Sequence, residues 1–140
     1  MNETTSRGAS ATGSLGFEVL ERTDFPELGE RSEGKVRDIY MQPARAIFVT
    51  TDRHSSFDRI IAHIPGKGEI LNRSSAFWFE QTKDIIPNHV IAIPDPNVTV
   101  GRRCTPLKIE IVMRGYLTGV TSTSIWTAYQ KGQRDFGGFT

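Results

Sequence analysis

A short proline-containing turn between two strand-like segments limits the folds open to this chain. The first segment is Glu33–Tyr40, and the second, Arg45–Thr51, has the apolar centre Ala46-Ile47-Phe48-Val49. Between them, Met41-Gln42-Pro43-Ala44 predicts a turn, because proline presets φ and cannot donate to a strand ladder. The pattern therefore predicts a β-hairpin of two antiparallel strands.

The rest of the chain adds one long helix and further strands. Apolar residues at helical spacing over about Ile70–Ile86, followed by Pro87, favour an amphipathic helix. Strands are expected at Asn88–Ile93 and Thr105–Arg114, and a short helix at Ser124–Lys131. Hairpins dominate over regular βαβ units, so the expected class is α+β, with an antiparallel or mixed sheet and one long packed helix.

Composition restricts the kinds of partner. Hydrophobic residues make up 37% of the 140 residues and charged residues 24%, which excludes a disordered or membrane-embedded chain. The net charge of +1 gives no general attraction to nucleic acid or to an anionic membrane. Any anion site must therefore be local.

The sequence also favours a reducing, cytoplasmic setting. Cys104 is the only cysteine, so the chain can form no internal disulfide. No apolar run approaches the roughly 20 residues of a membrane-spanning helix, and the N-terminus lacks a signal-peptide core. Residues 1–14 are rich in Ser, Thr, Gly and Ala and are expected to form a disordered extension.

The segment Gly34–Tyr40 combines a glycine, two cations and a carboxylate. On a strand, Lys35 and Arg37 would share one face, and Gly34 would let the backbone approach a polyanion closely. This arrangement suits phosphate. The same alternation also describes an edge strand protected by lysine, and both interpretations are open at this point.

Two further segments have the composition of binding loops. Thr51–Asp58 is polar, poor in helix formers and flanked by apolar strands, which predicts a functional loop. Ile64–Gly68 places glycines on both sides of Lys67, a geometry that could bind an anion or simply form a tight connection.

The remaining basic pair, the histidines and the cysteine give weaker evidence of function. Arg102-Arg103 could suggest nucleic-acid binding, but a basic pair in a near-neutral chain is usually solvated surface. The three histidines lack metal-ligand spacing, and Cys104 is more typical of a small buried residue than of a nucleophile. The histidines are His54, His63 and His89.

Five motifs together resemble the N-terminal half of the SAICAR synthetase (phosphoribosylaminoimidazole-succinocarboxamide synthase) family. The resemblance covers about Glu33 to Gly132 and depends on the order and spacing of the motifs. They are Gly34–Tyr40, Thr51–Asp58, Ile64–Gly68, Ser75–Phe79 and Arg114–Gly119. It implies a nucleotide-binding lobe over residues 15–105 and the incomplete start of a central ATP- and substrate-binding lobe over 106–140.

The resemblance also implies a reaction. The family joins the carboxylate of carboxyaminoimidazole ribonucleotide to the amine of L-aspartate at the expense of ATP, through a carboxyl phosphate. Phosphoryl transfer of this kind depends on charge neutralisation and positioning more than on a protein nucleophile. The alternative is a non-catalytic nucleotide-binding module.

Carried over by position, the resemblance implies two sets of site residues. The ATP-binding set joins the basic hairpin to a strand that holds adenine: Gly34, Lys35, Arg37, Pro106, Lys108 and Glu110. The substrate-binding set combines the polar loop, a lysine and the arginine motif: Asp52, Ser55, Ser56, Asp58, Lys67, Arg114 and Ser124. Within it, Arg114 falls on the arginine that faces the ribonucleotide phosphate, where a planar guanidinium fork suits the anion.

The chain departs from the family pattern in three ways. Lys108 stands where the family usually has proline, and Val120 stands where a hydroxyl residue usually follows the second glycine. A gap makes Ser124 the matching hydroxyl, with Ser122 as the second choice. The family's magnesium-binding carboxylates belong to its C-terminal half, so we expect no metal ligands here and little or no activity from this chain alone.

Overall fold

The predicted hairpin forms, with one difference in its first strand. In the computed structural model, which describes residues 10–12 and 18–138, β4 (Arg37–Met41) pairs antiparallel with β5 (Arg45–Thr50). The predicted strand Glu33–Tyr40 is divided, because β3 (Glu30–Glu33) ends before residues 34–36 and pairs back onto β4. The N–H of Gly34 donates to the carbonyl of Arg37 at 2.8 Å and closes this turn. Lys35 and Arg37 therefore do not share one face of a single strand.

These strands belong to a five-stranded sheet in the order β3-β4-β5-β9-β8. All of its neighbouring pairs are antiparallel, which confirms the α+β class with an antiparallel sheet. β8 (Val90–Asp95) lies two residues later than the strand expected at Asn88–Ile93. β9 (Val98–Arg102), which the sequence analysis missed, fills the position between β5 and β8.

A small apolar cluster holds one face of this sheet. Tyr40, Ile47 and Val49 are buried together from β4 and β5. Leu20, Phe25, Leu28, Val98 and Val100 pack against them. The Tyr40 hydroxyl accepts a hydrogen bond from the N–H of Phe25 at 3.1 Å, so the segment before β3 is tied to the cluster by polar as well as apolar contacts.

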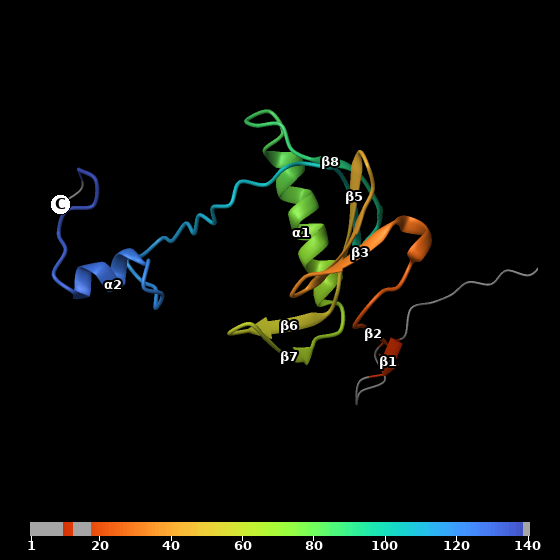
Figure 1. Cartoon of the computed structure of the whole chain (residues 1–140), viewed down its shortest axis with the longest axis horizontal. Helices are drawn as coiled ribbons and strands as arrows, with labels where there is room; N and C mark the ends of the chain where they lie inside the picture. Colours follow the sequence, from red (N-terminus) through yellow and green to blue (C-terminus); the bar gives the residue numbers. More distant parts are fainter. Residues whose placement is uncertain (1–9, 13–17, 139–140) are drawn as a thin grey trace, which may run out of the picture. The chain divides into compact units, whose positions relative to one another are not determined.

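The long predicted helix is α1 (Lys67–Gln81), which lies alongside the sheet (Figure 1). It begins earlier than expected because Gly66, at φ 75°, turns the chain directly into the helix. It ends at Gln81, where the Thr82 hydroxyl donates to the Trp78 carbonyl at 2.8 Å. A Cβ on Gly68 would stand 2.3 Å from the Thr50 carbonyl oxygen, so glycine allows the helix to approach β5.

Two small hairpins accompany the main sheet. β6 (Arg53–Ser56) pairs with β7 (Arg59–His63), so the polar segment expected to be a loop is largely strand, with its tip at Phe57 and Asp58. Both tip residues have positive φ, at 49° and 62°. β1 (Ser10–Thr12) pairs with β2 (Glu18–Leu20). The three residues of β1 were expected to belong to a disordered extension. Pairing requires only extended backbone, and the remainder of residues 1–14 lies outside the described residues.

The chain divides into two units, Met1–Thr105 and Pro106–Thr140. The second unit contains α2 (Ile125–Gln130), which confirms the short helix expected at Ser124–Lys131. The strand expected at Thr105–Arg114 does not form, because no partner strand pairs with it among the described residues. Its apolar side chains are exposed, with Leu107 at 85% and Met113 at 89%.

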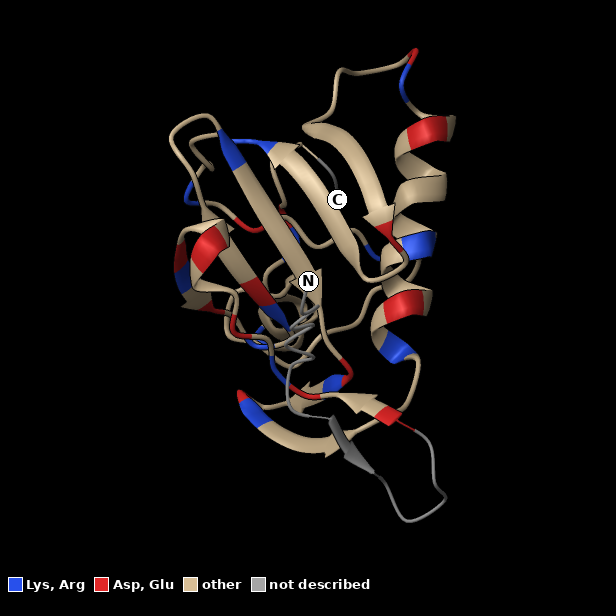
Figure 2. Ribbon diagram, turned by 90° about the vertical axis from the view of Figure 1, so that its right-hand side faces the viewer, with Lys and Arg blue, Asp and Glu red and all other residues tan. Residues whose placement is uncertain are grey.

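Basic and acidic residues occur in nearly equal numbers, in agreement with the net charge of +1. Basic and acidic bands alternate along α1 (Figure 2), where Arg73 pairs with Glu69 one turn earlier. Within the described residues, no helix is both long and apolar enough to cross a membrane.

Candidate functional site

The turn between β3 and β4 presents Lys35 to solvent. The Lys35 ammonium forms an ion pair with the Asp58 carboxylate at the tip of the β6–β7 hairpin, and the two side chains are 68% and 79% exposed. The hydrogen bond from Lys35, followed by its charge, lowers the pKa of Asp58 below the ordinary value. The structure thus brings together one residue expected to bind ATP and one expected to bind substrate.

Arg37 lies on β4, two residues after Lys35, and faces a groove of about 360 Å³ on the sheet. Its guanidinium carbon stands 5.8 Å from the centroid of the Phe48 ring, within cation–π range. Polar and apolar side chains of the sheet and of α1 share the lining, among them Thr50, Asn72, Ser75, Phe79 and His89. Asn72 is buried, and its side-chain oxygen accepts a hydrogen bond from the Thr99 hydroxyl at 2.7 Å.

Beneath the turn is a buried ion pair that the sequence analysis did not assign. Arg53 Nη2 lies 3.0 Å from Asp38 Oδ1, and neither side chain is appreciably exposed. Asp38 Oδ2 also accepts hydrogen bonds from the Thr23 N–H at 2.6 Å and the Thr23 hydroxyl at 2.9 Å. Burial opposes ionisation of Asp38, but the bonds from Thr23 and Arg53 and the Arg53 charge outweigh it, so its pKa is lowered.

A signal for this pair was present in the sequence. Arg37 and Asp38 are consecutive residues of β4, so their side chains point to opposite faces of the strand, and Asp38 is the one that is buried. A buried carboxylate needs a cation or several donors. Arg53, in the polar segment, supplies the cation from 15 residues away.

The candidate substrate residues of the first unit have different environments. Asp52 is buried, and its two oxygens accept the N–H groups of Gly68 at 2.8 Å and Leu20 at 2.9 Å. This carboxylate therefore fixes the first turn of α1. The Lys67 ammonium donates a hydrogen bond to the Arg53 carbonyl at 2.9 Å. Ser55 and Ser56 lie half-buried on β6, close to the hairpin tip.

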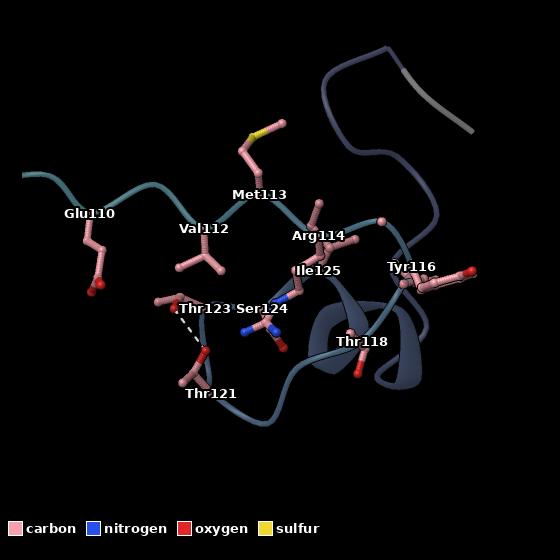
Figure 3. Close-up of a pocket in the computed structure, with 12 residues that line it drawn as sticks. Glu110, Val112, Met113, Arg114, Tyr116, Thr118, Thr121, Thr123, Ser124 and Ile125 are labelled. Carbon is pink, nitrogen blue, oxygen red and sulfur yellow. Dashed lines mark hydrogen bonds between the residues drawn. The ribbon is translucent and has the colours of Figure 1, made fainter. Parts of the chain in front are cut away.

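In the second unit, three candidate residues line one pocket of about 690 Å³. They are Glu110, Arg114 and Ser124. Figure 3 shows the Arg114 side chain reaching toward Ser124, while Glu110 lies toward the other end of the lining segment. Pro106 and Lys108 precede this pocket on an exposed stretch and are not among its lining residues.

Ser124 has a structural role at this pocket. Its hydroxyl accepts the Thr127 N–H at 3.2 Å and is the N-cap of α2. Gly119, at φ 126°, packs against it so closely that a Cβ there would stand 2.7 Å from the Ser124 Cβ. The same position would be 3.6 Å from Arg114 Nε, so Gly119 lets the arginine and the serine come together.

No group of three or more His, Cys, Asp or Glu side chains in the described part of the chain is arranged to hold a metal ion. The residues present therefore do not fit a magnesium site by themselves. We assign none of them to the metal.

Comparison with known families identifies the same similarity across most of the chain. The family model described as SAICAR synthetase matches residues 30–135. The phosphoribosylaminoimidazole-succinocarboxamide synthase of Legionella pneumophila (strain Paris) is 51% identical over 121 residues, which are 86% of this chain and 38% of the relative. The chloroplastic synthase of Vigna aconitifolia is 51% identical over 113 residues, 81% of this chain and 33% of the relative.

A solved structure shows the same similarity. SAICAR synthase from Saccharomyces cerevisiae, in complex with SAICAR, superposes with a TM-score of 0.71 at 28% identity. The match covers 86% of this chain and 47% of the yeast chain. This chain thus spans less than half the length of the proteins it resembles.

Proposed function

The chain belongs to the SAICAR synthetase family, and on that premise we propose that it forms the nucleotide-phosphate-binding part of an ATP-dependent ligase. The reaction joins the carboxylate of carboxyaminoimidazole ribonucleotide to the amine of L-aspartate. Relatives of about 50% identity named as this synthase support the proposal over a non-catalytic nucleotide-binding module.

The chemistry proceeds in two balanced steps. A carboxylate oxygen of the ribonucleotide attacks the γ-phosphorus of ATP, and ADP leaves with the electron pair of the broken bond. The aspartate nitrogen then attacks the carbonyl carbon of the resulting acyl phosphate, loses a proton, and expels phosphate. Both steps move charge on phosphate oxygens, which fixed cations stabilise.

The observation that carries the proposal is the cationic β3–β4 turn. Lys35 stands exposed on this turn, and Arg37 follows at the start of β4 above the groove. An exposed ammonium and a planar guanidinium two residues apart are suitable donors for the phosphates of a nucleotide. Gly34 closes the turn through its bond to Arg37.

Residues of the second unit are proposed to bind the ribonucleotide phosphate and the adenine of ATP. Arg114, beside Ser124, would receive the ribonucleotide phosphate, and Glu110 lies on the same pocket. The stretch with Pro106 and Lys108 would offer main-chain groups to adenine. Ser55, Ser56 and Asp58 on the β6–β7 hairpin are the proposed polar contacts for substrate in the first unit.

Calorimetric titration of the 140-residue chain with ATP tests the proposal. Lys35→Ala is expected to raise the Kd for ATP about tenfold, because a charge-assisted contact to phosphate is lost. Lys83→Ala removes an equally exposed lysine that pairs with Glu80 on the surface, and it should leave the Kd unchanged. Equal Kd values for Lys35→Ala and the unaltered chain would contradict the phosphate role of the turn.

A coupled assay with ATP, ribonucleotide and aspartate separates binding from ligation. Since this chain spans 38% of the length of the Legionella pneumophila relative, we propose that it binds ATP without forming SAICAR. Turnover by the purified chain would contradict this part of the proposal.

A further inference from the structure

The guanidinium of Arg53 is bonded to the turn that carries Lys35. Arg53 Nη2 donates to the Gly34 carbonyl at 2.9 Å, and Nε donates to the Lys35 carbonyl at 3.2 Å. The side chain is only 4% exposed, so these bonds do not compete with water. Two adjacent carbonyls of the turn are thus fixed by one side chain.

The next carbonyl is fixed by a neighbour of Arg53. Thr51 donates both its N–H and its hydroxyl to the Val36 carbonyl, each at 2.9 Å. Three consecutive carbonyl oxygens therefore accept hydrogen bonds from residues 51 and 53. A carbonyl oxygen carries partial negative charge and would repel a phosphate, so this arrangement favours an anion on the turn.

The other side of the guanidinium is fixed as well. Nη2 also donates to Asp38 Oδ1 at 3.0 Å, and Nη1 donates to the Glu21 carbonyl at 2.8 Å. Since Asp38 is itself held by Thr23, the plane of the guanidinium has little freedom. A lysine at this position would keep the charge next to Asp38 but could not reproduce the planar fork.

We propose that Arg53 is a positioning residue of the phosphate-binding turn, acting through the backbone of Gly34 and Lys35 without touching the nucleotide. The inference rests on the proposed function of that turn. The backbone carbonyl of Arg53 also accepts a hydrogen bond from the Lys67 ammonium, so Arg53 connects the turn to the first residue of α1.

The test compares Arg53→Lys with Arg73→Lys, a matched change at an exposed arginine of α1. Calorimetry of the 140-residue chain would give the Kd for ATP and for adenosine, which lacks phosphate. Arg53→Lys is expected to raise the Kd for ATP about tenfold, the size of one charge-assisted contact, and to change the Kd for adenosine less than twofold. Arg73→Lys should change neither.

A double variant shows whether Arg53 acts through the turn. In a Lys35→Met background, Arg53→Lys is expected to add nothing to the loss of ATP affinity. An equal loss for ATP and adenosine, or an additive loss in the double variant, would overturn the positioning role. If Arg53→Lys does not fold, Thr51→Val removes one bond to the same turn and should weaken ATP binding with the same selectivity.

Amide hydrogen exchange separates failure of this inference from failure of the proposed function. Arg53→Lys should speed exchange of the Gly34 and Thr51 amides, which donate to the Arg37 and Val36 carbonyls at this turn, about tenfold relative to Arg73→Lys, whether or not nucleotide is present. Unchanged exchange at the turn would overturn the positioning role alone. No ATP binding by the unaltered chain would overturn the proposed function, and with it the phosphate role of the turn.

Discussion

Arg53 Nη2 lies 3.0 Å from Asp38 Oδ1, and this buried ion pair joins β6 to β4 beneath the turn that carries Lys35. Arg31 also pairs with Asp38, because its Nη2 lies 3.1 Å from the same oxygen. The arrangement therefore concentrates two cations on one inaccessible carboxylate. Its energetic importance can be measured directly.

Asp38→Asn is expected to lower the free energy of unfolding by about 3 kcal/mol at neutral pH, because Arg53 would remain buried without its counter-charge. Since folding lowers the pKa of Asp38, its contribution is present above the unfolded value of about 3.9 and is lost as the pH falls through the folded value. The difference from the unaltered chain should therefore shrink below about pH 4. Urea unfolding from pH 7 to pH 3 measures it.

The matched control is Asp84→Asn, which removes an exposed carboxylate. It should change the free energy of unfolding by less than about 0.5 kcal/mol throughout. A loss in Asp38→Asn that stays constant from pH 7 to pH 3 would contradict the ionised pair.

The ion pair between Lys35 and Asp58 predicts competition with nucleotide. Asp58→Asn is expected to lower the Kd for ATP about two- to fivefold at low salt, because phosphate no longer competes with a carboxylate for Lys35. The gain should disappear near 1 M salt, where the screening length is about 3 Å. Calorimetry at two salt concentrations checks this, with Asp84→Asn again as control, and weaker ATP binding would show that Asp58 contributes to the site.

The approach of α1 to the sheet depends on Gly68. Gly68→Ala would bring a Cβ to 2.3 Å from the Thr50 carbonyl oxygen and 2.6 Å from Asn97 Nδ2. We expect a loss of about 2 kcal/mol in thermal or urea unfolding. Gly115→Ala, where nothing lies within 4 Å of the new Cβ, should be nearly neutral, and equal effects of the two changes would contradict the close approach.

The cap of α2 gives a prediction for the second unit. Ser124→Ala should destabilise this helix by about 1 kcal/mol, because the Thr127 N–H loses its acceptor. Exchange of the Thr127 amide would report the change. Ser122→Ala alters the exposed serine that the sequence offered as second choice, and it should leave the helix intact.

Local patterns predicted much of this fold. The apolar centre of Arg45–Thr51 and the adjoining turn identified the hairpin, and helical spacing identified α1 and α2. A pattern of alternating residues reports which side chains share a face, but it does not report whether a partner strand exists. This explains why Thr105–Arg114 was expected to be a strand and forms none among the described residues.

Contacts between residues far apart in the chain could not be predicted from the sequence. The composition of Gly34–Tyr40 suited contact with phosphate, but the division of this segment into a turn and a strand depends on the Gly34 bond to Arg37. The role of Arg53 depends on carbonyls 18 and 19 residues away. Spacing along the chain carries no information on such bonds.

Amide NMR of the isotope-labelled chain during titration with ATP tests the central claim most directly. The account predicts that shift changes concentrate at residues 34–37, and that ATP causes larger changes there than adenosine does. Shift changes that leave this turn unaffected and gather instead around Arg102 and Arg103 would contradict it.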